Sequence, residues 1–246
     1  MAAKNDGMYG YRARIGYTSP PLTTEVFPYE FYKVMPDGVT LVITTLAIVE
    51  RSKEEVERSY EISMNAARAM AKSGVDMIML GGVPINVSRG YANAQQMISD
   101  LEKELGVTVS TSANAQTKAF KALGSKRIVV AHPYEESENW RFDEYSQKFG
   151  CEVLGTVAWG TPIAKVGTVP RHAALELGRK VLKAHPEADT ILFPSPHWPV
   201  IEAVEALERE FGVTTMSSMQ AIFWDMLRSA GITDGVQGYG RLLCDF

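Results

Sequence analysis

Four side chains that could perform acid–base or nucleophilic chemistry lie just after two short β-branched runs in the second half of the chain. His132 and Tyr134 follow one run, and Ser195 and His197 follow the other. An imidazole exchanges protons near neutral pH and can activate a neighbouring hydroxyl. If the two runs are adjacent strands of a parallel sheet, these groups share one edge. We therefore predict catalytic roles for Ser195, His197 and Tyr134, and a substrate-binding role for His132.

The remaining histidines and a metal site are weaker candidates. His172 and His185 fall on or beside helical patterns in polar surroundings, so we interpret both as surface side chains. A metal site that combines His132 and His197 with an acidic side chain, Glu135 or Glu136, fits the spacing but is the weaker interpretation of these residues. We expect no metal.

Loops in the first half have the composition of ligand-binding turns. Glycine and proline let the backbone approach a ligand closely, although ordinary turns use the same residues. Agreement between several loops favours a ligand site over turn chemistry alone. The candidate substrate-binding residues are Ser19, Pro20, Gly82, Val83, Asn86 and Ser112, together with Pro196 in the second half.

Short β-branched runs alternate with helical patterns along the chain, which indicates parallel sheets covered by helices. The predicted strands are 14–17, 39–45, 76–80, 107–109, 127–131, 152–157, 190–193 and 213–216. Apolar residues with a period near 3.6 predict helices over 52–73, 94–105, 113–123, 138–149, 171–183, 200–211 and 221–230.

The sequence repeats itself at a distance of about half its length. EKELGVT at 102–108 matches EREFGVT at 208–214, and a weaker echo precedes each copy. We predict an α/β protein of two similar doubly wound, flavodoxin-like parallel-sheet lobes with pseudo-two-fold symmetry and an active site in the cleft between them. Residues 14–123 with 219–246 form the predicted first lobe, and residues 124–218 the second.

Composition limits the partners and the compartment. Of the 246 residues, 46% are apolar and 22% charged, which is typical of globular proteins, and the net charge of −4 argues against nucleic acid. The first sixteen residues lack an apolar core and no stretch is long enough to span a bilayer. We expect a cytoplasmic protein with no membrane partner. A homo-oligomer is an alternative, with Tyr29, Phe31 and Tyr32 as its candidate face.

Two cysteines, Cys151 and Cys244, are too few for a disulfide framework or a four-thiolate zinc site. They leave thiol catalysis open. The chain has no GxGxxG after a strand, no GxxxxGK[ST] loop, no HExxH and no GxSxG. We expect no cofactor.

The repeated halves, the stretch SSMQAIFWDMLRSAG at 217–231 and GYGRLL at 238–243 resemble the Asp/Glu racemase superfamily, in its arylmalonate decarboxylase and maleate cis-trans isomerase branch. The resemblance implies cofactor-free chemistry beside a carboxylate, with a stabilised oxyanion. The family's first thiol position falls at Gly82, as in the decarboxylases, and its second at Ser195. Pro20 matches a substrate-lining proline, and Tyr134 a carboxylate-binding tyrosine.

This sequence departs from the family in its cysteines. Cys151 and Cys244 lie outside both thiol positions, and Val83 and Pro84 stand where the decarboxylases have two hydroxyl donors. A thiol can give and take a proton near neutral pH, whereas a serine hydroxyl needs help from a base or acid such as His197 or His132.

Four functional hypotheses follow. We favour a cofactor-independent lyase of the arylmalonate decarboxylase type, acting through an enediolate-like intermediate on a small, aryl-substituted or plain carboxylic or dicarboxylic acid. The alternatives are a maleate isomerase-like or racemase-like isomerase with altered chemistry, a Ser/His hydrolase of a small amide or lactam, and a non-catalytic carboxylate-binding protein. Every hypothesis makes a small carboxylate or amide the partner.

Overall fold

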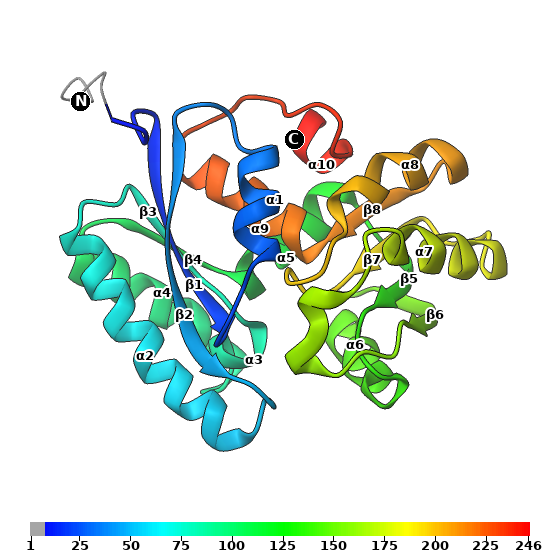
Figure 1. The fold of residues 1–246 in the computed structure, drawn as a ribbon, viewed down its shortest axis with the longest axis horizontal. Helices are drawn as coiled ribbons and strands as arrows, with labels where there is room; N and C mark the ends of the chain where they lie inside the picture. Colours follow the sequence, from blue (N-terminus) through cyan, green and yellow to red (C-terminus); the bar gives the residue numbers. More distant parts are fainter. Residues whose placement is uncertain (1–7) are drawn as a thin grey trace. The chain divides into compact units, whose positions relative to one another are not determined.

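The structure, a computed structural model, describes residues 8–246, except for the side chains of residues 91, 92, 143, 145 and 147. In this part of the chain the strands form two four-stranded parallel sheets, with orders β2-β1-β3-β4 and β6-β5-β7-β8 (Figure 1). The second strand in each order is the first in the sequence, which is the doubly wound arrangement. The predicted fold class, two similar flavodoxin-like sheets, is confirmed.

The strands are β1 (Ala13–Pro21), β2 (Val39–Ile48), β3 (Met77–Leu80), β4 (Thr108–Thr111), β5 (Arg127–His132), β6 (Glu152–Ala158), β7 (Thr190–Phe193) and β8 (Thr214–Ser217). The α-helices are α1 (Val26–Val34), α2 (Lys53–Lys72), α3 (Val83–Asn86), α4 (Tyr91–Leu105), α5 (Ser112–Leu123), α6 (Asn139–Gln147), α7 (Ala173–Ala184), α8 (Ile201–Phe211), α9 (Ser218–Ser229) and α10 (Arg241–Asp245). Two 3₁₀ helices, η1 (Glu136–Glu138) and η2 (Ile163–Thr168), complete the list.

Every predicted strand and helix is present, and the structure adds α1, α3 and α10. Pro28 lies in the first turn of α1, where the missing N–H costs nothing. A proline more often breaks a helix than begins one, so the sequence around Pro28 gives a weak helix signal. The other two are too short to show a period.

The duplication extends to individual hydrogen bonds. Asp76 accepts a bond from the backbone N–H of Arg14 at 2.8 Å, and Asp189 does the same for Arg127 at 2.8 Å. Both carboxylates therefore fix the first residues of the central strand of their sheet. The bonds repeat because the two halves have the same topology and the same residue types at these positions.

A second pair of equivalent hydrogen bonds involves the sequence repeat at 102–108 and 208–214. Glu102 accepts from the N–H of Val109, and Glu208 from the N–H of Thr215, both at 3.0 Å. The helix before each strand ends at a glycine in the left-handed region, Gly106 with φ 67° and Gly212 with φ 68°. The repeated EKELGVT-type segment is thus a helix end, a glycine cap and the start of a strand.

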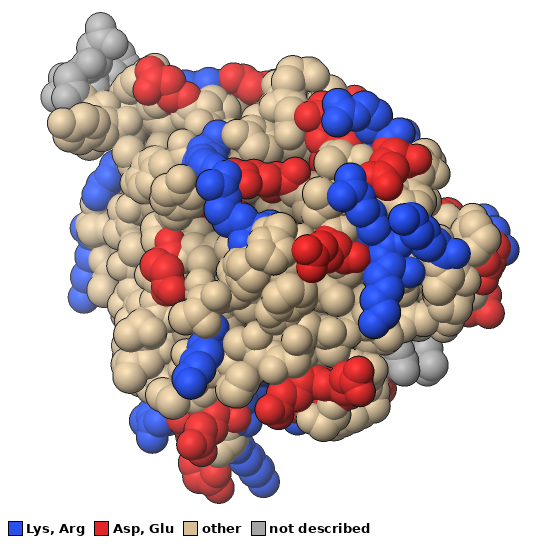
Figure 2. Space-filling model, turned by 45° about the vertical axis from the view of Figure 1, so that its right-hand side comes forward, with Lys and Arg blue, Asp and Glu red and all other residues tan. Residues whose placement is uncertain are grey.

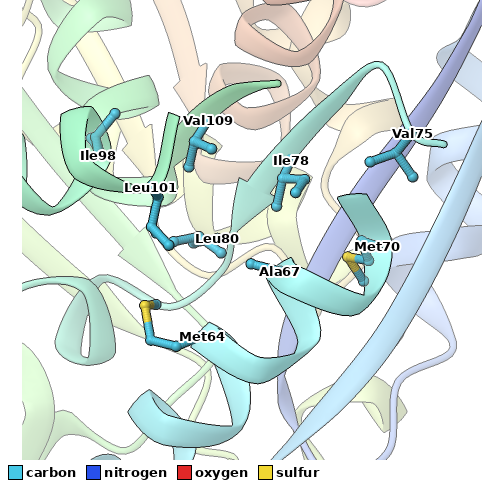
Figure 3. Close-up of a cluster of buried hydrophobic side chains, with 9 residues drawn as sticks. All are labelled: Met64, Ala67, Met70, Val75, Ile78, Leu80, Ile98, Leu101 and Val109. Atoms are coloured by element: carbon cyan, nitrogen blue, oxygen red, sulfur yellow. The ribbon is translucent and has the colours of Figure 1, made fainter. Parts of the chain in front are cut away.

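The core of the first sheet forms where helices pack against its strands. Figure 3 shows one cluster of buried side chains, in which residues of α2 and α4 meet those of β3 and β4. Its members are Met64, Ala67, Met70, Val75, Ile78, Leu80, Ile98, Leu101 and Val109. All are buried, so this packing fixes the carboxyl ends of β3 and β4.

The chain divides into two compact units. One contains the described residues up to Thr24, then Phe31–Ala115 and Ile222–Asp234; the other contains Glu25–Glu30, Gln116–Ala221 and Gly235–Phe246. This differs from the predicted boundaries, which assigned residues 25–30, 116–123, 219–221 and 235–246 to the first lobe.

Two contacts explain why the C-terminal segment belongs with the second sheet. A Cβ at Gly240 would lie 2.4 Å from a methyl of Val204, so only glycine allows this approach to α8. Glu208 also accepts a hydrogen bond from the N–H of Arg241 at 3.0 Å. The GYGRLL stretch is thus an anchoring segment of the second unit.

Charged side chains of both signs lie interspersed on the face drawn in Figure 2. Among the described residues, some charged side chains form ion pairs between helices, such as Arg68 with Glu104 at 2.6 Å and Arg179 with Glu210 at 2.8 Å. No helix among the described residues is long and apolar enough to cross a membrane.

Candidate active site

The carboxyl edge of the first sheet is shaped by a two-glycine turn. The N–H of Gly81 donates to the carbonyl and to Oγ1 of Thr18, both at 3.0 Å, and Ser63 lies 3.1 Å from that hydroxyl. Gly82 follows with φ +83°, and a Cβ there would lie 2.8 Å from Cγ of Pro20. The backbone conformation and the contact with Pro20 thus disfavour any side chain at Gly82, which the resemblance predicts to be the family's first thiol position.

Two buried polar atoms lie beside this turn. Ser19 is fully buried and Asn86 is 4% exposed. The amide nitrogen of Asn86 donates to the carbonyl of Gly81 at 3.4 Å. The amide oxygen, Oδ1, takes no part in this bond. Among the described residues, neither Oγ of Ser19 nor Oδ1 of Asn86 has a hydrogen-bond partner. Buried polar atoms without a partner are uncommon and favour a ligand-binding role.

A buried carboxylate from α9 lies beside the end of β4. Asp225 of α9 is 2% exposed and accepts a hydrogen bond from the hydroxyl of Ser110, which in turn accepts from the amide of Asn114 at 3.1 Å. The Ser110 hydroxyl is therefore engaged within the fold. Ser112, the first residue of α5, is 2% exposed and is the better candidate for holding a carboxylate at this helix N-terminus.

His132 ends β5 and is fully buried. Its Nε2 lies 2.7 Å from Oδ1 of Asn139, and its ring lies 4.5 Å from that of Phe142, centroid to centroid. Burial lowers the pKa of His132, while the bond to Asn139 and the charges of Glu138 and Glu136 oppose this to a smaller extent. The ring is consequently kept neutral over more of the physiological range than a free histidine.

Backbone bonds fix the segment that carries His132 and Tyr134. The N–H groups of Trp159 and Gly160 donate to the carbonyls of His132 and Tyr134 at 2.9 and 3.0 Å. The ring of Tyr134 is buried and stacks against that of Phe142, with 8° between the planes. The predicted Tyr134 therefore lies on a braced loop beside His132.

Ser195 adopts a backbone conformation that a serine rarely takes. It has φ +73°, one of two residues other than glycine with positive φ in the described chain. It stands two residues after β7, as Gly82 stands two residues after β3. A left-handed residue with a side chain costs about 1–2 kcal/mol, and such strain is concentrated at functional sites.

His197 contacts Ser195 through its backbone. Its N–H donates to Oγ of Ser195 at 3.4 Å, and its ring lies 6.3 Å from that of Phe27, centroid to centroid. β5 and β7 are hydrogen-bonded neighbours, as the sequence predicted. Adjacent strands place the two histidine loops at one edge, with His132 held by Asn139 and His197 beside Ser195.

Trp198 has a structural role. It is fully buried, and its indole N–H donates to the carbonyl of Pro194 at 3.0 Å. It braces the Ser195 loop from within. Pro196 and Val83, the neighbours of Ser195 and Gly82, are half-buried and stay candidates for contact with a ligand.

Neither cysteine has the environment of a reactive thiol. Cys151 is buried and donates to the carbonyl of Ser125 at 3.6 Å, and burial raises its pKa. A hydrogen bond with Asp245 raises the pKa of Cys244. Catalytic thiols need the opposite shift. This agrees with a site that works without cysteine.

The surface histidines are less isolated than the sequence indicated. His185 is half-buried, and its ring covers Gly155, where a Cβ would lie 2.3 Å from Nε2. His172 is exposed but lies edge-on to Trp159 at 6.0 Å between ring centroids. Glu135 and Glu136 are exposed, and no group of three potential metal ligands is present among the described residues.

Two sheets of equal topology, with hydroxyl, amide and imidazole groups at their carboxyl edges, define a protein of the Asp/Glu racemase type. The sequence model of the arylmalonate decarboxylase family matches residues 15–243, so this chain belongs to that family. The predicted branch of the superfamily is confirmed.

The chain is 27% identical over 234 residues to arylmalonate decarboxylase from Bordetella bronchiseptica, covering 93% of this chain and 95% of that protein. It is 26% identical over 187 residues to maleate isomerase from Nocardia farcinica, covering 74% and 72%. A crystal structure of arylmalonate decarboxylase matches with a TM-score of 0.77 at 26% identity, over 94% of this chain and 98% of the other. The predicted class, a lyase or isomerase, agrees with both relatives.

The strain at Ser195 predicts a difference between two substitutions that both remove the hydroxyl. Ser195→Gly relieves the left-handed backbone, whereas Ser195→Ala keeps it, so the glycine variant should be the more stable by about 1 kcal/mol. Urea unfolding with unchanged m-values would measure this. An alanine variant as stable as the glycine variant would contradict the strain.

The lowered pKa of His132 predicts a pH dependence of stability. Because the unfolded chain binds a proton at a higher pH than the folded chain, this contribution is intact above about pH 6.5 and is lost as pH falls below it. The free energy of unfolding should rise with pH across this range. His132→Phe should flatten the slope and His172→Phe should not; equal slopes in all three proteins would refute the assignment.

Proposed function

We propose that this protein is a cofactor-independent decarboxylase that acts on a small substituted malonate. The observation that supports it most strongly is the glycine at the first thiol position, where Pro20 and the left-handed backbone leave no room for a side chain. A racemase needs a proton-transferring group on each side of the substrate carbon, whereas a decarboxylase needs one proton donor. This chain has Gly82 at the first of the two assigned positions and Ser195 at the second, so only the second position carries a group that can transfer a proton.

The reaction would proceed through an enediolate. The bond between the substrate α-carbon and one carboxylate breaks, carbon dioxide leaves, and the electron pair moves into the remaining carboxylate. Ser112 at the N-terminus of α5, Ser19 and Tyr134 are the donors that we assign to the carboxylate oxygens. A proton delivered to the α-carbon then gives the monoacid.

Ser195 and His197 supply that proton in our proposal. A serine hydroxyl is too weak an acid to act alone, so protonated His197 would return a proton to Ser195 as Ser195 protonates the α-carbon. Ser195 is strained and 9% exposed, and we assign it to the position of the family's second thiol. The backbone N–H of His197 donates to Oγ of Ser195 at 3.4 Å, which keeps the two residues side by side.

Carbon dioxide release from phenylmalonate and methyl-phenylmalonate tests the proposal. We expect turnover by the unmodified protein and a loss of at least about a hundredfold in kcat for Ser195→Ala and for His197→Gln, because each would remove part of one proton-transfer unit. Ser137→Ala, at an exposed position, is the matched control and should keep full activity.

Two results would count against it. Failure to release carbon dioxide from any malonate would exclude the decarboxylase. Turnover that is indifferent to Ser195→Ala would keep the reaction but remove Ser195 from it.

A further inference from the structure

The second sheet holds a buried hydrogen-bond acceptor that no described residue of the fold uses. Nε2 of His132 lies 2.7 Å from Oδ1 of Asn139. An amide oxygen only accepts, so Nε2 carries the proton, and in the neutral ring Nδ1 carries the lone pair. Nδ1 is buried and has no hydrogen-bond partner among the described residues.

Its surroundings keep this acceptor in one form. The rings of Phe142 and Tyr134 lie 4.5 and 6.0 Å from the ring of His132, centroid to centroid, and limit its rotation. The charged groups that act on it are Glu136 and Glu138, and burial outweighs them. The neutral Nε2–H tautomer is therefore the form of His132 near neutral pH.

The first sheet shows the same arrangement with a different residue. The Asn86 amide nitrogen donates to the carbonyl of Gly81, and this contact fixes which end of the amide is its oxygen. That oxygen is also buried and has no hydrogen-bond partner among the described residues. Both edges thus orient a side chain through one bond and leave its acceptor unused.

A plain dicarboxylate cannot satisfy either atom, because ionised carboxylates only accept hydrogen bonds. A buried acceptor left unpaired is destabilising, and a ligand with a matching donor would remove this cost on binding. We propose that the substrate carries an O–H or N–H group beside its carboxylate, that this group donates to Nδ1 of His132, and that Asn139 is the positioning residue that fixes this acceptor. The substrate class is a hydroxy- or amino-substituted acid. The inference takes the substrate's carboxylate from the proposed function and its donor group from the unused acceptor of His132.

Two unreactive acids that differ by one hydroxyl test this directly. Mandelate has the donor and phenylacetate lacks it, and binding of each can be measured by calorimetry on the full chain. We expect mandelate to bind at least about tenfold more tightly. His132→Phe should abolish this preference, and His172→Phe, at an exposed histidine, should preserve it.

A second measurement tests Asn139 and does not depend on binding. ¹⁵N spectra of His132 should show the Nε2–H tautomer in the free protein. Asn139→Leu should lose both this tautomer and the mandelate preference. Asn139→Asp retains an acceptor and should restore both when measured above about pH 8, where the added charge leaves the ring neutral.

The outcomes separate this inference from the proposed function. Equal affinities for the two acids, including no binding of either, would overturn the donor-bearing substrate even if phenylmalonate is decarboxylated. An Nδ1–H tautomer in the free protein would overturn the role of Asn139. Preference for mandelate without carbon dioxide release from any malonate would support the inference and refute the decarboxylase.

Discussion

The backbone enters the left-handed region two residues after the third strand of each sheet, and both edges depend on this turn. At Gly82 the conformation costs little, and the absence of a side chain lets Pro20 approach. At Ser195 the same conformation is strained, and the fold retains it by bracing the loop with the Trp198–Pro194 bond. An equivalent backbone thus holds a vacant position on one sheet and a hydroxyl on the other.

This difference between the halves determines what each can contribute. The first edge offers hydroxyl and amide groups on a scaffold fixed by Thr18 and Ser63. The second edge adds two imidazoles, one tied to Asn139 and one following Ser195. At the opposite ends of the central strands, Asp76 and Asp189 accept equivalent hydrogen bonds. The two sheets are therefore alike at the start of their central strands and differ at their carboxyl edges.

The sequence predicts much of this fold because the spacing of apolar residues and the residue types of turns are local properties. All the predicted strands appear, and the repeat at 102–108 and 208–214 marks equivalent elements. The edge residues were also foreseen, since parallel strands bring their carboxyl ends together. The hydrogen-bond partners of the site residues could not be predicted, because they depend on how helices distant in the sequence pack against the strands. Asn139 reaches His132 from the next helix, and Asp225 reaches Ser110 from a helix 115 residues away. The left-handed backbone of Ser195 and the return of residues 235–246 to the second unit likewise require the folded chain.

The central claim is that Ser195 occupies the proton-transfer position of a site otherwise arranged for decarboxylation. The most direct measurement is the rate of carbon dioxide release from phenylmalonate by Ser195→Cys, compared with the unmodified protein in a Cys151→Ser background. A thiol, with an ordinary pKa of about 8.5, transfers protons near neutral pH without help, so the rate should rise by at least about a hundredfold. An unchanged or lower rate in a variant of unchanged stability would contradict the claim.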